Sequence, residues 1–273
     1  MNKILTDFST HAIVAALRQN FYDALWELGD HWNEAVFEET EKQRRWWTPI
    51  PMAFIFNAAI SRRPPADDET EHIHETIEFF QSKGRMSFSW WLDPGLEESG
   101  WGRHLQAHGF HFETGSPGMA VDLSILPERI PVQDGYHIQQ IQDPESMKIW
   151  LKLLLQGYGF PPDWETPIWG FMLATLSDPN GMSYLAFVHD QPVAVSTILY
   201  RAGVAGMFNV ATLKEWRGKG LGAAVTLRPL LDARAKGYRV GTLQSSEMGY
   251  NVYQRLGFKE VCRMNQYDWR KTE

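Results

Sequence analysis

The sequence predicts an α/β protein built on a mixed, mostly antiparallel sheet flanked by helices. Apolar residues make up 44% of the chain, which is enough for real cores and too much for a disordered protein. Apolar residues at helical spacing predict an amphipathic helix over residues 10–28. Short apolar runs bounded by turn residues predict three successive strands, over 183–188, 193–200 and 205–212.

The first half contains both helical and strand-like segments. In chain order we expect helix 10–28, helix 33–45, strand 49–57, a helix ending near 83, strand 85–91, helix 97–108 and strand 118–126. Asp67 or Asp68 is the expected cap of the third helix, and Gly84 its end.

The second half predicts an antiparallel meander followed by crossover units. We expect strand 136–141, helices 144–157 and 164–177, strands 183–188, 193–200 and 205–212, helix 220–236, strand 238–244, helix 249–256 and strand 264–269. This order gives a mixed sheet with helices on its faces. The stretch P-E-R-I-P-V-Q-D-G (127–135) has the composition of a linker, so we divide the chain into domains 1–130 and 131–273.

Charge and composition narrow the classes of function. The formal net charge is −7, and residues 1–130 hold 11 Lys/Arg against 20 Asp/Glu, which argues against general nucleic-acid binding. No apolar stretch approaches the ~18 residues of a spanning helix, and the N-terminus lacks the apolar core of a signal peptide. A single cysteine, Cys262, excludes an intrachain disulfide. We expect a cytoplasmic monomer or homodimer with no membrane or nucleic-acid partner.

The two halves share a weak signature near their ends. The first contains L-Q-A-H-G-F-H-F-E (105–113) before M-A-V-D-L, and the second contains Y-Q-R-L-G-F-K-E-V (253–261) before M-N-Q-Y-D-W. Both predict a helix, a glycine and a closing strand. The signature indicates an internal duplication, although helix-Gly-strand is also a common join that needs no shared ancestry.

The segment W-R-G-K-G-L-G (216–222) follows the strand-like run M-F-N-V-A-T and precedes a predicted helix. Glycines at such a junction let backbone amides approach an anion, and the helix dipole adds positive charge. Neither the P-loop spacing nor the dinucleotide fingerprint is present. By itself the segment indicates either a phosphate cradle or a tight turn with close packing.

The context of this loop resembles the GNAT superfamily of acyl-CoA-dependent N-acetyltransferases. Arg217, Gly220 and Gly222 match the family's loop [Q/R]-x-x-G-x-[G/A], and V-Y-Q-R-L-G-F (252–258) resembles its tyrosine-bearing segment. The resemblance covers residues 136–270 well and 50–125 faintly. It implies a GNAT fold, with two tandem GNAT-like domains of which the first is degenerate, because nothing like R-G-K-G-L-G occurs there.

The resemblance also implies acetyl-CoA as co-substrate and no metal. The residues that it assigns to the pyrophosphate are Arg217, Gly218, Lys219, Gly220, Leu221, Gly222 and Ala223. Val210, Ala211 and Thr212 form the strand that would bind pantetheine, with Val210 and Thr212 offering backbone groups to an amide-containing ligand.

Tyr253 occupies the position where the family often has a tyrosine that protonates the leaving CoA thiolate. A phenol has a pKa of about 10 and a thiol about 8.5, so the tyrosine needs local tuning or only orients the sulfur. The alternative for Tyr253 is aromatic packing. Ser246 stands where many members have an asparagine, and we keep it as a cofactor contact.

Two further site features depart from the family or stay open. The strand M-F-N-V-A-T offers no carboxylate as general base, so the amine loses its proton to water or to a carboxylate elsewhere, such as Asp163 or Glu165, and we assign neither. Aromatic residues in the predicted acceptor region indicate either an apolar acceptor slot or core packing: Phe160, Trp164, Trp169 and Phe171.

The histidines do not predict a metal site. Histidines 72, 74, 104, 108 and 111 lie in the half of the chain where no arrangement of carboxylates accompanies them.

The predicted function is therefore acetyl-CoA-dependent N-acetyl transfer to a primary amine by direct attack in a ternary complex, which depends mainly on positioning. The acceptor is a small-molecule or peptide amine, and the acidic first half favours a cationic one. The alternative is a CoA-binding protein whose activity is lost or regulatory.

Overall fold

The computed structural model describes residues 3–29, 32, 34–61, 63–65, 69–96 and 98–271, so Asp67 and Asp68 lie outside the described residues. The chain forms two compact units that alternate along it. Unit 1 comprises Met1–His31 and Pro117–Val261, and unit 2 comprises Trp32–Ser116 and Cys262–Glu273. The first helix therefore belongs to the same compact unit as most of the second half of the chain. The division into domains 1–130 and 131–273 stays a prediction.

Unit 1 contains a mixed sheet in the order β5-β10-β9-β8-β7-β6. Its strands are the end of β5 (Phe110–Asp122), β6 (Tyr136–Gln140), β7 (Gly181–Val188), β8 (Gln191–Arg201), β9 (Val204–Thr212) and β10 (Val240–Gln244). Only the β9–β10 pair is parallel; the other described pairs of this sheet are antiparallel. The predicted meander and crossover are confirmed.

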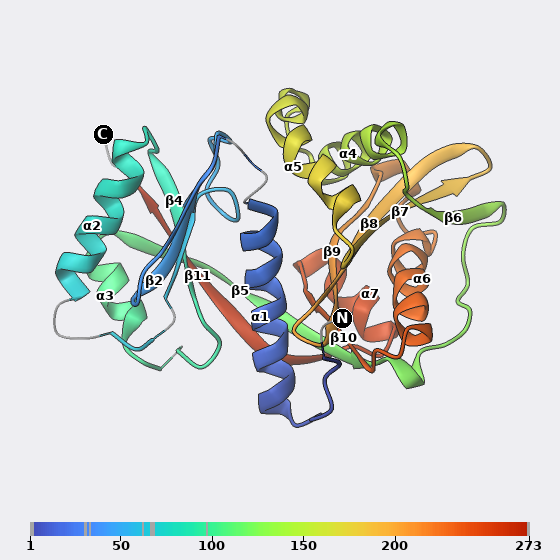
Figure 1. Cartoon of the computed structure of the whole chain (residues 1–273), viewed down its shortest axis with the longest axis horizontal. Helices are drawn as coiled ribbons and strands as arrows, with labels where there is room; N and C mark the ends of the chain where they lie inside the picture. Colours follow the sequence, from blue (N-terminus) through green and yellow to red (C-terminus); the bar gives the residue numbers. More distant parts are fainter. Residues whose placement is uncertain are drawn as a thin grey trace. The chain divides into compact units, whose positions relative to one another are not determined.

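Helices cover both faces of this sheet (Figure 1). They are α1 (Thr10–Gly29), α4 (Pro144–Tyr158), α5 (Glu165–Ser177), α6 (Leu221–Ala235) and α7 (Glu247–Arg255), with short 3-10 turns η1 (Leu123–Ile125), η2 (Pro162–Trp164) and η3 (Lys214–Trp216). Side chains of a strand alternate between faces. On β8, Ile198 packs with α6 and α7, whereas Leu199 packs with Ala24 of α1 and Phe171 of α5.

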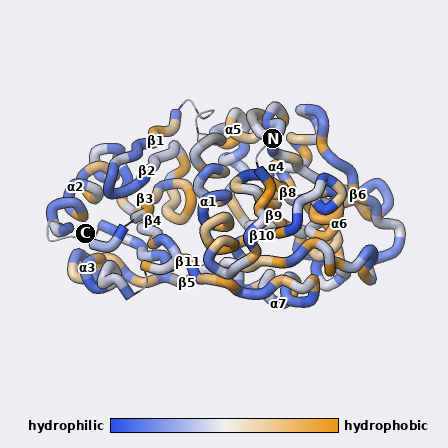
Figure 2. The backbone as a smooth tube through the Cα atoms, turned by 60° about the horizontal axis from the view of Figure 1, so that its bottom comes forward, coloured by the Kyte–Doolittle hydropathy of each residue, from blue (hydrophilic) through white to orange (hydrophobic). Residues whose placement is uncertain are grey.

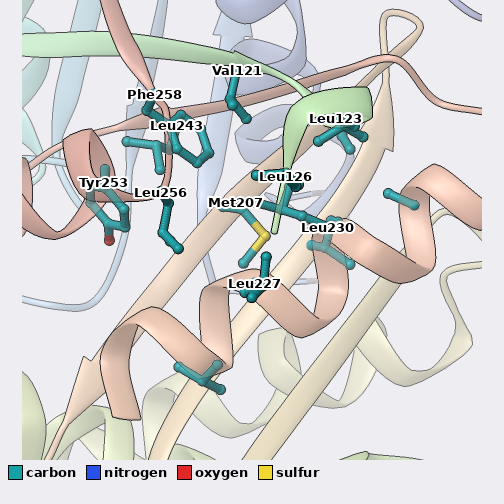
Figure 3. Close-up of a cluster of buried hydrophobic side chains, with 14 of the residues drawn as sticks. Val121, Leu123, Leu126, Met207, Leu227, Leu230, Leu243, Tyr253, Leu256 and Phe258 are labelled. Atoms are coloured by element: carbon teal, nitrogen blue, oxygen red, sulfur yellow. The ribbon is translucent and has the colours of Figure 1, made fainter. Parts of the chain in front are cut away.

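The main core of unit 1 lies between the sheet and helices α6 and α7. Figure 3 shows Met207 of β9 next to Leu227 and Leu230 of α6, and Leu243 of β10 next to Phe258, with Tyr253 of α7 at one side. Hydropathy follows this layout, since β8 and β9 are rich in hydrophobic residues and the edge strand β6 is mostly hydrophilic (Figure 2).

Unit 2 repeats the pairing pattern of unit 1. Its strands run in the order β1-β2-β3-β4-β11, namely Val36–Glu39, Gln43–Trp47, Ala58–Ser61, Ser87–Leu92 and Lys259–Arg270, and its helices are α2 (Glu69–Ser82) and α3 (Trp101–Ala107). In both units an antiparallel pair leads into a parallel pair, β3–β4 or β9–β10, whose second strand pairs antiparallel with β11 or β5. This repetition supports the predicted duplication.

The glycine signature lies at matching places. Gly109 (φ 83°) joins α3 to β5, and Gly257 (φ 95°) joins α7 to β11, so each strand begins after a left-handed residue that suits glycine. Each of these strands starts in one unit and ends in the other.

The helix predicted over 33–45 is wrong, because β1 and β2 form a hairpin there. The charges that suggested a solvated helix instead pair across the strands: Arg45 contacts Glu38 at 2.6 Å and Arg44 contacts Glu39 at 2.9 Å. On the hairpin, Phe37 also stacks on Trp46 with ring centroids 6.3 Å apart. Cross-strand pairing therefore explains the sequence better than helical periodicity.

The strand predicted over 49–57 is also wrong, and β3 begins only at Ala58. The side chain of Asn57 closes the preceding segment into a loop. Its amide donates to the carbonyl oxygens of Ile50 and Met52, both at 2.7 Å, and its Oδ1 accepts from the backbone of Thr48 at 3.0 Å. These bonds satisfy backbone groups that a strand would have paired with a neighbour.

Candidate active site

Strands β9 and β10 separate at their C-terminal ends. Their parallel register stops at Met207 and Leu243. Immediately afterwards Asn209 adopts φ 53°, and the register with β8 shifts between Val195 and Thr197, so β9 carries a bulge. A bulge bends its strand. The last residues of β9 thus leave the sheet before the glycine loop.

The backbone of Thr212 faces the opening left by this separation. The amide of Leu213 donates to the Val193 carbonyl of β8 at 3.0 Å. Since antiparallel residues alternate in direction, Ala211 also turns its backbone towards β8, and Thr212 turns its backbone away. This edge offers the Thr212 amide to a ligand, as predicted for the strand that includes Val210, whereas the Thr212 carbonyl accepts from Arg217. Occupancy by pantetheine stays a prediction.

The glycines of the loop 216–222 allow left-handed backbone conformations and close packing against the neighbouring chain. Gly218 (φ 77°) and Gly220 (φ 80°) are left-handed. A side chain at Gly220 would collide with the carbonyl of Pro131, whereas one at Gly218 would meet nothing within 4 Å. The amide of Gln133 also donates to the Lys219 carbonyl at 3.0 Å, so the 127–135 segment supports the loop.

The loop ends in exposed backbone donors at the start of α6. Gly220 is the N-cap and offers no side chain, and the first helical bond runs from Ala224 to the Gly220 carbonyl at 2.9 Å. The amides of Leu221, Gly222 and Ala223 consequently have no carbonyl partner among the described residues. The Leu221 side chain is buried in the core, so only its backbone is available to a ligand.

Arg217 fastens the loop to its surroundings. Its Nε donates to the Thr212 carbonyl at 3.1 Å, and its Nη2 donates to the Gly157 carbonyl of α4 at 2.8 Å. Lys219 keeps its ammonium 4.3 Å from the ring centroid of Trp216. The arginine thus braces the strand end against α4, and both cations add positive charge beside the α6 amides.

Tyr253 is buried in the core, at 8% exposure, and packs edge-on against Phe258. A side chain at Gly249 would lie 2.8 Å from its ring, so this glycine leaves room for the tyrosine one turn later on α7. Its hydroxyl points away from Phe258 (Figure 3) and has no hydrogen-bond partner in the described part of the chain. Burial raises the pKa of Tyr253 to about 12.

Ser246 lies at the N-cap of α7, where its Oγ accepts from the Gly249 amide at 3.2 Å. Its predicted contact with the cofactor therefore needs the remaining capacity of this hydroxyl and stays a prediction. Asp163 is exposed in η2, and Glu165 begins α5. Neither of these two carboxylates is singled out as a base.

The aromatic candidates separate into two groups. Phe171 is partly buried and packs against the core residues Ala24 and Leu199. Phe160 and Trp164, by contrast, contact each other beyond the end of α4 with centroids 5.1 Å apart, and Tyr158 joins them at 5.5 Å from Phe160. Tyr158 is not among the site residues that the sequence predicted. Its only signal was Gly157, since a glycine inside a helical pattern often marks close backbone approach.

Other polar features lie apart from this site. His74 and His108 of unit 2 contact each other with ring centroids 5.1 Å apart, and among the described residues no group of three ligand-type side chains surrounds a point. A cavity of about 350 Å³ lies beside the C-terminal half of α6, lined by Gln140, Met182, Tyr184, Arg228, Asp232, Ala235 and Lys236. It contains no predicted site residue. In the described ranges, every helix is too short or too polar to span a membrane.

Comparison with known proteins agrees with this geometry. The model of the acetyltransferase (GNAT) family matches residues 144–258, which include α4, β9, the glycine loop and Tyr253. No curated protein sequence matches the chain significantly.

Solved structures resemble the whole chain. A GCN5-related N-acetyltransferase from Kribbella flavida is 17% identical, with a TM-score of 0.69 over 95% of this chain and 96% of that one. One from Sphaerobacter thermophilus is 14% identical, with a TM-score of 0.63 over 99% and 95%. A tandem GNAT protein from the clavulanic acid biosynthesis pathway is 11% identical, with a TM-score of 0.61 over 97% and 96%.

At these identities the likeness concerns the fold, and it confirms the expected mixed sheet of a tandem GNAT architecture. The family match covers the segment that contains the candidate site, and it supports acyl-CoA-dependent acetyl transfer in general. The segment that carries the splayed strand, the glycine loop and Tyr253 is a domain of the acetyltransferase (GNAT) family.

Proposed function

We propose that this protein is an acetyl-CoA-dependent N-acetyltransferase that acts on a primary amine. The observation that carries the proposal is the start of α6, where three amides without carbonyl partners meet Arg217 and Lys219 at the end of a splayed strand. Amides and positive charge at a helix N-terminus suit a pyrophosphate, and an unpaired strand edge suits an amide-containing arm.

The residues present fit this co-substrate. Gly218 leaves open space beside the loop, and Leu221, Gly222 and Ala223 supply the donors. Lys219 adds a charge that the Trp216 ring holds in place, while Arg217 keeps Thr212 and α4 in position. When bound, acetyl-CoA would supply an activated acyl group as a thioester.

The burial of Tyr253 supports a hydrogen-bonding role for its hydroxyl. With its pKa near 12, Tyr253 stays protonated at physiological pH. Full transfer of its proton to a thiolate of reference pKa about 8.5 would be uphill by roughly 5 kcal/mol. A hydrogen bond from the hydroxyl needs no such transfer and is strengthened in a low-dielectric site. We therefore assign Tyr253 the stabilisation of the leaving sulfur by hydrogen bonding.

The acceptor amine must reach the site uncharged in order to attack. Neither Asp163 nor Glu165 bonds into the site, so the amine loses its proton to water. Positioning of the two reactants then supplies most of the rate enhancement, because well-oriented groups gain effective molarities of about 10⁵ M or more.

The proposal is tested by thiol release from acetyl-CoA across a panel of primary amines. Replacing Tyr253 by Phe should lower kcat about 100-fold and leave the acetyl-CoA dissociation constant unchanged, because only the hydroxyl is removed. Since the hydroxyl acts protonated and its pKa is near 12, wild-type activity should show no alkaline decline from this group up to pH 10.

Three outcomes are informative. An unchanged kcat in Tyr253→Phe would remove Tyr253 from catalysis. Tight CoA binding without turnover of any amine would favour a CoA-binding protein with lost or regulatory activity. Absence of acetyl-CoA binding would refute the cradle itself.

A further inference from the structure

We propose that Tyr158 is a second phenol of this site, which binds the acceptor beside the end of the splayed strand, and that Tyr158, Phe160 and Trp164 select an amine bearing an aromatic group. This inference rests on the proposed function, whose acceptor it specifies. It concerns unit 1 alone, since α4, η2, β9 and α7 all belong to that unit.

The last turn of α4 packs directly on the splayed strand β9. A side chain at Gly157 would lie 2.8 Å from Cβ of Ala211 and 3.6 Å from the Thr212 amide. Arg217 bonds both the Gly157 and the Thr212 carbonyls. The last turn of α4 is thus fixed directly against the strand end, and Tyr158 is the residue that follows the contact.

The hydroxyls of Tyr158 and Tyr253 are both available to a ligand. Neither Tyr158 nor Tyr253 bonds through its hydroxyl to another described residue. Burial raises the pKa of the Tyr158 hydroxyl, as it does that of Tyr253. Both therefore remain neutral donors, and neither is used by the fold.

Tyr158 begins a series of aromatic side chains beyond the end of α4. Its side chain is 45% exposed, so a ligand can reach the ring. Gly159 (φ 73°) ends α4 and turns the chain, so that Phe160 and then Trp164 follow in ring contact. Such a series of rings favours an aromatic group by stacking and an adjacent ammonium by cation–π attraction. A polyamine would instead need several carboxylates.

The test uses the full chain with acetyl-CoA and three amines: phenethylamine, hexylamine and spermidine. The wild type should turn over phenethylamine with a kcat/KM about 10-fold above hexylamine and further above spermidine. Tyr158→Phe should raise the KM for phenethylamine about 10-fold, as expected for one lost hydrogen bond, without changing the KM for acetyl-CoA. Trp164→Ala should abolish the preference for the aromatic amine.

Tyr136→Phe is the matched control, because Tyr136 is similarly exposed at 40% but lies on the edge strand β6. It should leave every constant unchanged. Melting midpoints of all variants establish that they fold. If Trp164→Ala unfolds, Tyr158→Phe still decides the hydroxyl's role, and amine preference in the wild type decides the ring's role.

The outcomes separate this inference from the proposed function. Equal turnover of all amines, or an unchanged amine KM in Tyr158→Phe, overturns the inference while leaving acetyl transfer intact. If no amine is acetylated, the proposed function fails, and calorimetric binding of phenethylamine to the wild type and to Tyr158→Phe is measured instead. Equal affinity of the two proteins, or no binding, then overturns the inference as well.

Discussion

At the scale of single residues, Gly157 holds α4 close to β9. Glycine in a helix costs about 1 kcal/mol relative to alanine. Here an added Cβ would lie 2.8 Å from Cβ of Ala211, a short, rigid neighbour on the strand. An alanine at this position would therefore lose more free energy through the clash than it would gain from its higher helix propensity.

We expect Gly157→Ala to lower the free energy of unfolding by about 1–3 kcal/mol, the usual cost of overpacking. Gly170 of α5 is the matched control, since it is helical and an added Cβ would meet nothing within 4 Å. Gly170→Ala should stabilise the protein by about 0.5–1 kcal/mol. Urea unfolding of both variants measures the difference. Equal stabilisation by the two substitutions would contradict the close helix–strand contact.

The sequence locates Tyr253 but does not predict the protonation state of its hydroxyl. The motif located this tyrosine on a short helix ahead of Gly257, and the structure shows that helix as α7. Its protonation behaviour depends on burial among residues distant in the chain, such as Met207 and Leu243 of the same core. No local pattern encodes that burial, so the choice between proton transfer and hydrogen bonding required the tertiary structure.

At the scale of elements, the N-terminus of α6 is the anion cradle of the proposal. Gly222 occupies the second helical position, is not left-handed, and has only Thr212 Oγ1 at 3.3 Å from an added Cβ. It is therefore a better test position than Gly220, where any side chain collides with Pro131.

Gly222→Asp should weaken acetyl-CoA binding about 10- to 100-fold, because a carboxylate near a pyrophosphate costs about 1–3 kcal/mol after screening. The melting midpoint should not fall, since an acidic residue in the first turn stabilises a helix. Gly222→Asn, of equal size but uncharged, should bind more tightly than the Asp variant. Equal affinities would show that size rather than charge matters, and unchanged affinity in both would place the anion elsewhere.

Elements differ in how well their sequences predict them. The segment 193–212 is apolar and bounded by turns, so β8 and β9 were predicted closely. The hairpin of β1 and β2 was predicted as a helix because its charged residues pair across strands, and such pairing is not a local property. The 49–57 segment failed for a related reason, since the Asn57 side chain replaces strand partners.

At the scale of the whole molecule, the compact units do not follow the chain in two blocks. Unit 1 includes residues 1–31 and the segment from Pro117, and unit 2 includes the last residues from Cys262. Within unit 1, β5 pairs with β10 from Val240–Asp122 to Gln244–Gly118, and Asn20 of α1 donates to the carbonyls of Leu199 and Arg201 at 3.0 and 3.1 Å.

We therefore expect fragments 1–130 and 131–273, when co-expressed, to purify as a complex. Fragment 131–273 alone should aggregate or stay partly unfolded, because it lacks α1 and the β5 partner of β10 and exposes a strand edge. Affinity capture of one tagged fragment, followed by size exclusion and circular dichroism, measures this. Two stable, separate monomers would show that the cut at 130 respects the folding units.

The sequence by itself determined the family of the second half and the position of its loop, because glycine spacing, a preceding strand and a following tyrosine segment are local features. It also indicated the internal repeat through two glycine-ended helices. The tertiary structure decided how strands are shared between units, how Arg217 braces α4, and which aromatic residues stay outside the core. These properties depend on contacts between residues far apart in the chain, which periodicity and spacing do not encode.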